Sequence, residues 1–200
     1  MATPLRSILV VLTVLAAPPA ALACACCAER GAWFQAVERL GTHERAELNR
    51  VRFAREARLY LTAAGFAAVR GITRPAARYT ISRSVRAGRW TLAFRDARGG
   101  AGTLSFALPP RGESFGVDPR DGRSHPGGGP LLYKEWRLSG AASATGSFSP
   151  RGGLRFRLVL QGRGNVCLAA EQFRHWRLEV TGPDVRYAFY GALQPPAPRP

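Results

Sequence analysis

Four cysteines carry the clearest chemistry in this 200-residue chain. Cys24, Cys26 and Cys27 lie close together near the start, and Cys167 lies far downstream. In an oxidising compartment we expect a disulfide from Cys167 to one of the other three, which would tie the N-terminal segment to the rest of the domain. The sequence leaves open which of the three pairs. The remaining two could bridge each other or stay as thiols.

The same cysteines carry a second hypothesis, because thiolates are preferred ligands of soft ions such as Cu(I) and Zn(II). The Cys-Ala-Cys-Cys spacing is not that of a standard metal motif, and no histidine neighbours it. Asp118, Asp121 and His125 are irregularly spaced in a glycine-rich stretch, which favours a turn-rich loop over a metal site. We therefore predict no metal and no cofactor, with a redox or metal-handling N-terminus as an alternative function.

A local repeat supplies the candidate ligand-binding residues. Its copies are Glu135-Trp136-Arg137-Leu138 and His175-Trp176-Arg177-Leu178. Side chains alternate between the two faces of a strand, so the tryptophans would anchor a core while the charged residues pair on the solvent side. In the functional interpretation the repeat forms a ligand site. Its candidate residues are Glu135, Trp136, Arg137, His175, Trp176 and Arg177.

Catalysis is the alternative that the repeat also allows. An enzyme would use Glu135 and His175 as acid and base from neighbouring strands, and at least one of them would have a perturbed pKa. The chain has no phosphate-binding loop and no His-Glu-x-x-His zinc motif. We therefore lean towards a non-catalytic protein and assign no catalytic residue.

The charge of the chain is strongly basic, at +16 from 29 basic and 13 acidic residues, and every basic residue except Lys134 is an arginine. A solvated arginine-rich surface is the plain explanation. The functional one is attraction to an anionic partner, such as lipid head groups or envelope polysaccharide, which guanidinium groups bind with paired hydrogen bonds. Nucleic acid is not expected, because the arginines are scattered without a recognition motif.

Residues 1–23 predict a cleavable signal peptide. Arg6 precedes the apolar stretch 8–17, and Ala21-Leu22-Ala23 supplies the small residues of a cleavage site. The apolar stretch is too short to span a bilayer. We expect export to the periplasm or the exterior, with membrane contact only if Cys24 is lipidated, although Ala21 stands where a lipoprotein signal has leucine. The oligomeric state is not predicted.

The elements that would position these residues are strands. From Tyr79 onward, apolar and polar residues alternate in rows such as Leu154-Phe156-Leu158-Leu160, and turns such as Ala87-Gly88 separate the rows. We predict one all-β domain over residues 24–193, folded as an antiparallel up-and-down barrel of about 8–9 strands. A two-sheet β-sandwich is the alternative.

Three segments depart from this alternation. Residues 48–61 suit either a strand or a helix, and we favour a strand because the domain needs an opening strand there. Residues 109–130 predict a long Gly/Pro loop in which Phe115 and Val117 indicate a short strand. Residues 194–200 predict a disordered, proline-rich tail.

The Cys-Ala-Cys-Cys start, Leu131 to Arg137, Gln161 to Cys167 and His175 to Gly182 together resemble an uncharacterised family of exported bacterial β-rich proteins. The resemblance covers most of the chain after the signal peptide and implies no activity. Gly31-Ala32-Trp33 is similar to the Gly-x-Trp opening of lipocalins, which implies a ligand-holding barrel.

These features predict an exported binding or envelope-associated β-barrel protein. Its partner would be a small apolar ligand inside the barrel or an anionic envelope component outside it.

Overall fold

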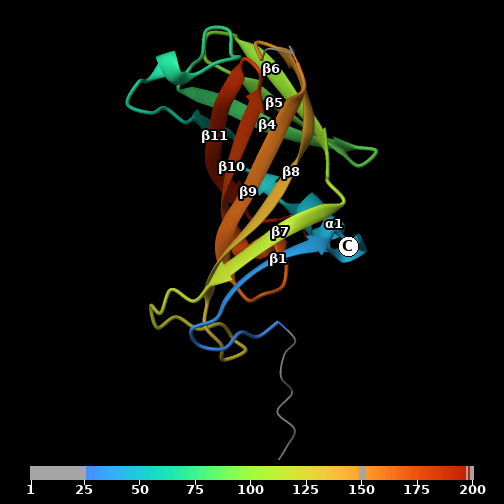
Figure 1. The fold of residues 1–200 in the computed structure, drawn as a ribbon, viewed down its shortest axis with the longest axis vertical. Helices are drawn as coiled ribbons and strands as arrows, with labels where there is room; N and C mark the ends of the chain where they lie inside the picture. Colours follow the sequence, from blue (N-terminus) through green and yellow to red (C-terminus); the bar gives the residue numbers. More distant parts are fainter. Residues whose placement is uncertain (1–25, 149–151, 197, 199–200) are drawn as a thin grey trace, which may run out of the picture.

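The computed structural model describes residues 26–148, 152–196 and 198, which form an all-β domain with 57% strand and 9% helix (Figure 1). The strands are β1 (Trp33–Arg39), β2 (Arg52–Phe53), β3 (Glu56–Leu59), β4 (Arg78–Arg86), β5 (Arg89–Arg95), β6 (Ala101–Ala107), β7 (Arg111–Val117), β8 (Leu132–Gly146), β9 (Leu154–Gly164), β10 (Phe173–Gly182) and β11 (Val185–Gln194). The helical elements are α1 (Thr42–Arg50), η1 (Phe66–Ala68) and η2 (Ala170–Gln172).

Eight of the strands close into an antiparallel barrel, which confirms the predicted fold class. Around the barrel the order is β8, β6, β5, β4, β3, β11, β10 and β9, and β9 pairs again with β8. Along the edge of the long strand β8 that faces away from β9, the first part pairs with β7 and the last part pairs with β6. β1 pairs with β7, so β7 and β1 extend the sheet beyond the barrel (Figure 1).

The turns follow the sequence chemistry. Ala87 and Gly88, with φ angles of 47° and 71°, form the two-residue turn between β4 and β5, where a tight hairpin needs positive φ at both positions. Between β5 and β6 the Asp96 carboxylate accepts hydrogen bonds from the backbone N–H groups of Arg98 and Gly100. These local interactions fix the register of the hairpins.

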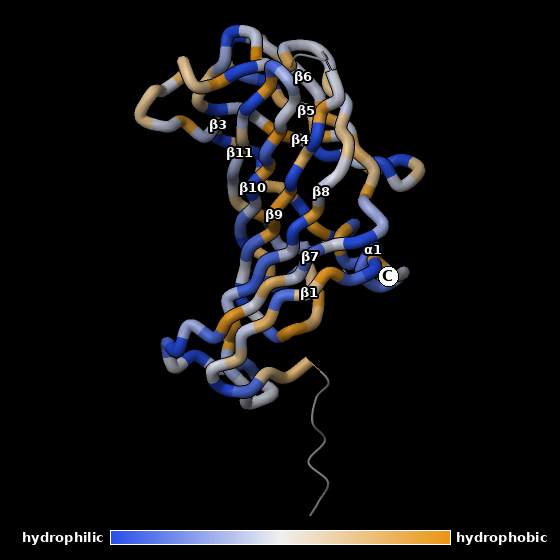
Figure 2. Tube along the Cα trace, viewed as in Figure 1, coloured by the Kyte–Doolittle hydropathy of each residue, from blue (hydrophilic) through white to orange (hydrophobic). Residues whose placement is uncertain are grey.

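The inner face of the barrel is packed with apolar side chains. Phe94 stacks on Phe189 with ring centroids 4.4 Å apart, and Phe106 stacks on Phe156 at 4.0 Å. Trp90 is fully buried among them. The strands accordingly alternate between hydrophobic and hydrophilic residues along their length (Figure 2).

The connection from β9 to β10 is held against the barrel by a buried lysine and a disulfide. The Nζ of Lys134 donates hydrogen bonds to the carbonyl oxygens of Asn165 (3.1 Å) and Cys167 and to the Oε1 of Gln172 (2.7 Å). Cys167 is bonded to Cys26. The chain before β1 and the chain after β9 are thus fastened together.

The segments that depart from simple alternation have mixed outcomes. The strand predicted within 48–61 is present as β2 and β3, but residues 48–50 end the helix α1, which the sequence pattern did not predict. The long loop near 109–130 contains β7, a longer strand than Phe115 and Val117 indicated. β11 continues to Gln194, one residue into the expected tail.

Candidate functional site

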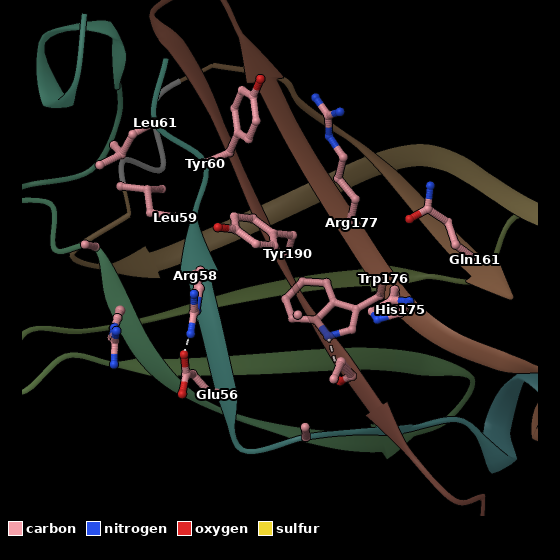
Figure 3. Close-up of a pocket in the computed structure, with 15 residues that line it drawn as sticks. Glu56, Arg58, Leu59, Tyr60, Leu61, Gln161, His175, Trp176, Arg177 and Tyr190 are labelled. Atoms are coloured by element: carbon pink, nitrogen blue, oxygen red, sulfur yellow. Dashed lines mark hydrogen bonds and ion pairs between the residues drawn. The ribbon is translucent and has the colours of Figure 1, made fainter. Parts of the chain in front are cut away.

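A groove of about 1050 Å³ opens on the outer face of the barrel, where β3, β10 and β11 meet (Figure 3). It arises from an irregularity in pairing. β11 pairs with β3 at Tyr190 and with β2 at Leu193, so residues 54–57 on one side face only residues 191 and 192 on the other. Such bulges bend a strand and re-aim its side chains. We call this hollow the outer groove.

Basic side chains surround the outer groove. Arg58, Arg78, Arg177 and His175 line it, together with one carboxylate, that of Glu56. They come from three different strands, β3, β4 and β10. They share one face, because Arg58 is the register partner of both Tyr190 and Arg78, and Tyr190 is the partner of Arg177. Closure of the barrel is what assembles them.

Two of the three arginines have acidic neighbours. The Nε of Arg58 lies 2.7 Å from the Oε1 of Glu56, and this hydrogen bond lowers the pKa of Glu56, so the carboxylate stays ionised. Arg177 lies 2.9 Å from Glu179. Arg78 forms no ion pair within 4.0 Å among the described residues, although its charge also helps to lower the pKa of Glu56. The outer groove therefore keeps an excess of positive charge.

Two tyrosines add flat apolar surface beside these charges. Tyr60 and Tyr190 are 49% and 41% exposed, and both line the groove. The Arg177 guanidinium lies 5.1 Å from the centre of the Tyr60 ring. In such a cation–π contact the ring holds the guanidinium in place, while the donors that do not face Glu179 stay available.

The floor of the groove is Trp176. It is 1% exposed, its Nε1 donates a hydrogen bond to the Ala192 carbonyl (3.2 Å), and its ring packs edge-on against Phe53 at 5.0 Å. Gly191 permits this position, because a Cβ there would lie 2.9 Å from the Trp176 Nε1. Figure 3 shows Trp176 with Arg58 and Glu56 on one side and His175 and Gln161 on the other.

The first copy of the repeat lies on a neighbouring part of the same outer face. Glu135 accepts hydrogen bonds from the Tyr133 hydroxyl (2.5 Å), the Gln161 Nε2 (3.0 Å) and the Arg137 Nε (2.7 Å). Burial alone would raise the pKa of Glu135, but these donors outweigh it and lower the pKa. Arg137 also donates to Glu113 at 2.9 Å.

The six repeat residues thus divide as the alternation predicts. Trp136 and Trp176 are buried in the core, whereas Glu135, Arg137, His175 and Arg177 lie outside. The acid–base hypothesis required Glu135 and His175 to converge. The register instead places Gln161 between them as the partner of both, and three donors hold Glu135 in its ionised form.

Of the cysteine candidates, the disulfide joins Cys26 to Cys167, whose Cα atoms are 5.3 Å apart. This pairing fits the expectation that Cys167 bonds one of the three N-terminal cysteines. The Cys27 Sγ lies 3.9 Å from the Gly127 carbonyl oxygen. Cys24 lies outside the described residues.

The glycine-rich loop has the turn structure expected of it. The Asp118 carboxylate accepts from the backbone N–H groups of Gly31 and Arg120, both at 2.8 Å, and Asp121 pairs with Arg163 at 2.6 Å. His125 accepts from the Gly127 N–H. Across residues 26–148, 152–196 and 198, no three histidine, cysteine or acidic side chains gather as a metal site.

One sequence pattern did not enter the prediction. Residues 112–116, Gly-Glu-Ser-Phe-Gly, fit the Gly-x-Ser-x-Gly letters of a hydrolase nucleophile elbow. They lie inside the strand β7, not at a strand-to-helix turn. Ser114 is 3% exposed, and its hydroxyl donates to the Ala36 carbonyl at 3.5 Å. The local structure does not present it as a nucleophile.

Sequence reasoning missed Arg58, Arg78, Tyr60 and Tyr190. Arg58 and Tyr60 alternate with the buried Leu59, and this outward position was the available signal. No helix within the described ranges is both long and apolar enough to cross a membrane. Comparison of the chain with protein-family models, curated proteins and solved structures found no match in any of the three.

Proposed function

We propose that this protein is an exported, non-catalytic binding protein that holds an acidic saccharide of the cell envelope in its outer groove. The observation that carries the proposal is the charge of that groove, in which Arg58, Arg78, Arg177 and His175 face a single carboxylate. Guanidinium groups bind carboxylates and phosphates through paired, charge-assisted hydrogen bonds. Arg78, the arginine without an ion-pair partner among the described residues, supplies the most available donor.

The tyrosines favour a saccharide over a simple anion. A sugar ring has apolar faces and a polar rim, and Tyr60 and Tyr190 offer exposed apolar rings with hydroxyl edges. Pockets that combine such surfaces with a few fixed polar groups are the usual form of small-ligand sites. Gln161, which also lines the groove, adds an amide for sugar hydroxyls.

The alternative of an apolar ligand inside the barrel has less support. The inner face is occupied by stacked aromatic rings, such as Phe94 on Phe189 and Phe106 on Phe156. A ligand there would have to displace core side chains, and large changes in core packing typically destabilise a protein by several kcal/mol. The outer face therefore supports binding better than the interior does.

Export remains a prediction from the sequence. The disulfide between Cys26 and Cys167 is compatible with an oxidising compartment. The expected signal peptide, residues 1–23, and the candidate lipidation site Cys24 lie outside the described residues.

The test is calorimetric titration of the oxidised protein with a hyaluronan disaccharide, which carries one uronic acid carboxylate. We expect binding that weakens when the salt concentration rises from about 0.05 M to about 0.5 M, because exposed charge pairs are screened. Arg78→Ala should weaken binding about tenfold, the loss expected for one hydrogen bond to a charged group.

Arg89→Ala provides the matched control, because Arg89 is an exposed arginine on β5, outside the residues that line the groove. It removes the same net charge and should leave the affinity within about twofold of wild type. Equal losses of affinity in the two variants would mean that the net charge of the protein, and not the groove, attracts the ligand. That result, or no binding at low salt, would overturn the proposal.

A further inference from the structure

The outer face continues from the groove onto β8, β7 and β1, and it carries a row of aromatic rings there. Trp33 lies edge-on to Phe115 with ring centroids 6.4 Å apart, and Phe115 lies edge-on to Tyr133, also at 6.4 Å. We call Trp33, Phe115 and Tyr133 the aromatic row. Trp33 and Phe115 come from β1 and β7, which extend the sheet beyond the barrel, and Tyr133 comes from β8, the barrel strand that β7 joins.

Trp33 is the unusual member of this row. It is 64% exposed on β1, the last strand of the sheet order, although a tryptophan is mostly buried in folded proteins. Its contact with Phe115 fixes the ring, yet most of its surface faces solvent. An exposed but positioned aromatic ring is typical of a binding surface.

Two carboxylates lie beside the row and are held in place. The Glu113 Oε1 accepts from the Gln35 Nε2 (2.5 Å) and from Arg137 (2.9 Å). Glu135 is held by Tyr133, Gln161 and Arg137. A carboxylate has about four acceptor positions, so these groups can still accept hydrogen bonds from ligand hydroxyls.

The charge of this region differs from that of the groove. Beside the aromatic row Arg137 stands between two carboxylates, and Arg163, the register partner of Tyr133, is paired with Asp121. These acidic groups outnumber the arginines by one, so the local balance is negative, whereas the outer groove is positive. A second anionic group would be repelled here. A neutral sugar with donor hydroxyls and an apolar ring face is complementary to the row.

The two regions are continuous through Gln161. Its Nε2 donates to both Tyr133 (3.1 Å) and Glu135, and the same residue lines the outer groove beside His175. From β11 to β1 the path crosses β10, β9, β8 and β7, which is about 24 Å at the usual spacing of neighbouring strands. Figure 1 shows these six strands following one another around one side of the molecule.

From these observations, and resting on the proposed function, we infer that the ligand is a polysaccharide that alternates acidic and neutral sugars. One acidic unit binds in the outer groove, and a neutral unit of the same chain stacks on Trp33 and donates hydroxyl hydrogen bonds to Glu113 and Glu135. The aromatic row is thus a second subsite. A chain that reaches both subsites binds more tightly than a short fragment that fills only the groove.

The experiment compares a hyaluronan disaccharide with an octasaccharide, because hyaluronan alternates uronic acid with a neutral sugar. We expect the octasaccharide to bind wild type at least about tenfold more tightly than the disaccharide. Trp33→Ala should reduce the octasaccharide affinity to the disaccharide level and leave the disaccharide affinity unchanged. Trp33→Tyr, which keeps a flat ring, should restore part of the difference.

Phe66→Ala is the control, since Phe66 is an exposed aromatic residue (44%) on η1, outside both subsites. It should change neither affinity. The inference is overturned if wild type binds the two fragments equally tightly. It is also overturned if Trp33→Ala still binds the octasaccharide more tightly than the disaccharide, because repeated acidic units that rebind in the groove would then explain the difference. It is also overturned if Trp33→Ala weakens the disaccharide as much as the octasaccharide.

The two proposals can be told apart by the disaccharide. If wild type fails to bind the disaccharide, the proposed function fails. If the disaccharide binds in a salt-dependent way but the length dependence is absent, the proposed function stands and only the second subsite is rejected.

Discussion

The Nζ of Lys134 donates a hydrogen bond to the carbonyl oxygen of Cys167, the residue whose sulfur is bonded to Cys26. Lys134 is the chain's single lysine, and it is buried, at 1% exposure. It holds the β9–β10 connection, which the disulfide also holds. A buried ammonium normally carries a large desolvation penalty, of which its three oxygen acceptors offset a part here.

Lys134→Met should destabilise the fold by about 2–4 kcal/mol. Methionine fills much of the same space but leaves the acceptors on Asn165, Cys167 and Gln172 without their donor, and buried unpaired acceptors are costly. Urea unfolding of the oxidised protein measures the difference. Arg89→Met, which removes an exposed cation, should change stability by less than about 0.5 kcal/mol. A loss of similar size in both variants would contradict the role given to Lys134.

Stability should also depend on pH through Lys134. Burial lowers its pKa from 10.5 to about 8, so between these values the unfolded chain binds more protons than the folded one. The free energy of unfolding therefore rises with pH in this window, by about 2 kcal/mol between about pH 7.5 and about pH 9.5.

The window must stop below pH 10, because burial and the hydrogen bond to Glu135 raise the pKa of Tyr133 to about 12, which gives the opposite slope at higher pH. The measurement is urea unfolding at several pH values for wild type and Lys134→Met. The variant should lack the rise. If both proteins show the same slope, another group is responsible.

Gly191→Ala should disturb the floor of the outer groove. A Cβ at this position would lie 2.8 Å from the Glu56 carbonyl oxygen and 2.9 Å from the Trp176 Nε1, so either the strand or the indole must move. We expect a loss of about 1–3 kcal/mol in unfolding free energy, the usual effect of overpacking, together with weaker disaccharide binding.

Gly153→Ala is its control, because a Cβ at Gly153 would meet nothing within 4 Å. It should leave both stability and binding close to wild type. Unchanged binding in Gly191→Ala, despite a loss of stability, would show that Trp176 does not form the floor of the site.

The barrel itself could be predicted because alternation is a local signal. Rows such as Leu154, Phe156, Leu158 and Leu160 are buried as their spacing indicates. The helix α1 could not be predicted in the same way, since Leu48 is its one buried apolar residue. Its other buried residue, Glu47, accepts a hydrogen bond from the Ala170 N–H, a partner far away in the sequence.

Only part of the candidate site could be predicted from the sequence, for the same reason. His175, Trp176 and Arg177 stand out through their repeat, which is visible along the chain. Arg58 and Arg78 become neighbours of Tyr190 only where β3 lies between β4 and β11. Pairing over that sequence distance has no local signature, so the groove and the aromatic row emerge only from the closed barrel.

The pairing of β3 with β11, which closes the barrel, also predicts the order in which the strands fold. Leu59 pairs with Phe189, so the first and last strands of the barrel meet only when nearly the whole domain is available, whereas the β4–β5 and β10–β11 hairpins can form locally. Contacts between distant segments form slowly, because a long loop must close before they are gained. The hairpins should therefore form early and the β3–β11 pairing last. The outer groove, which this pairing assembles, should then be the last part of the domain to fold.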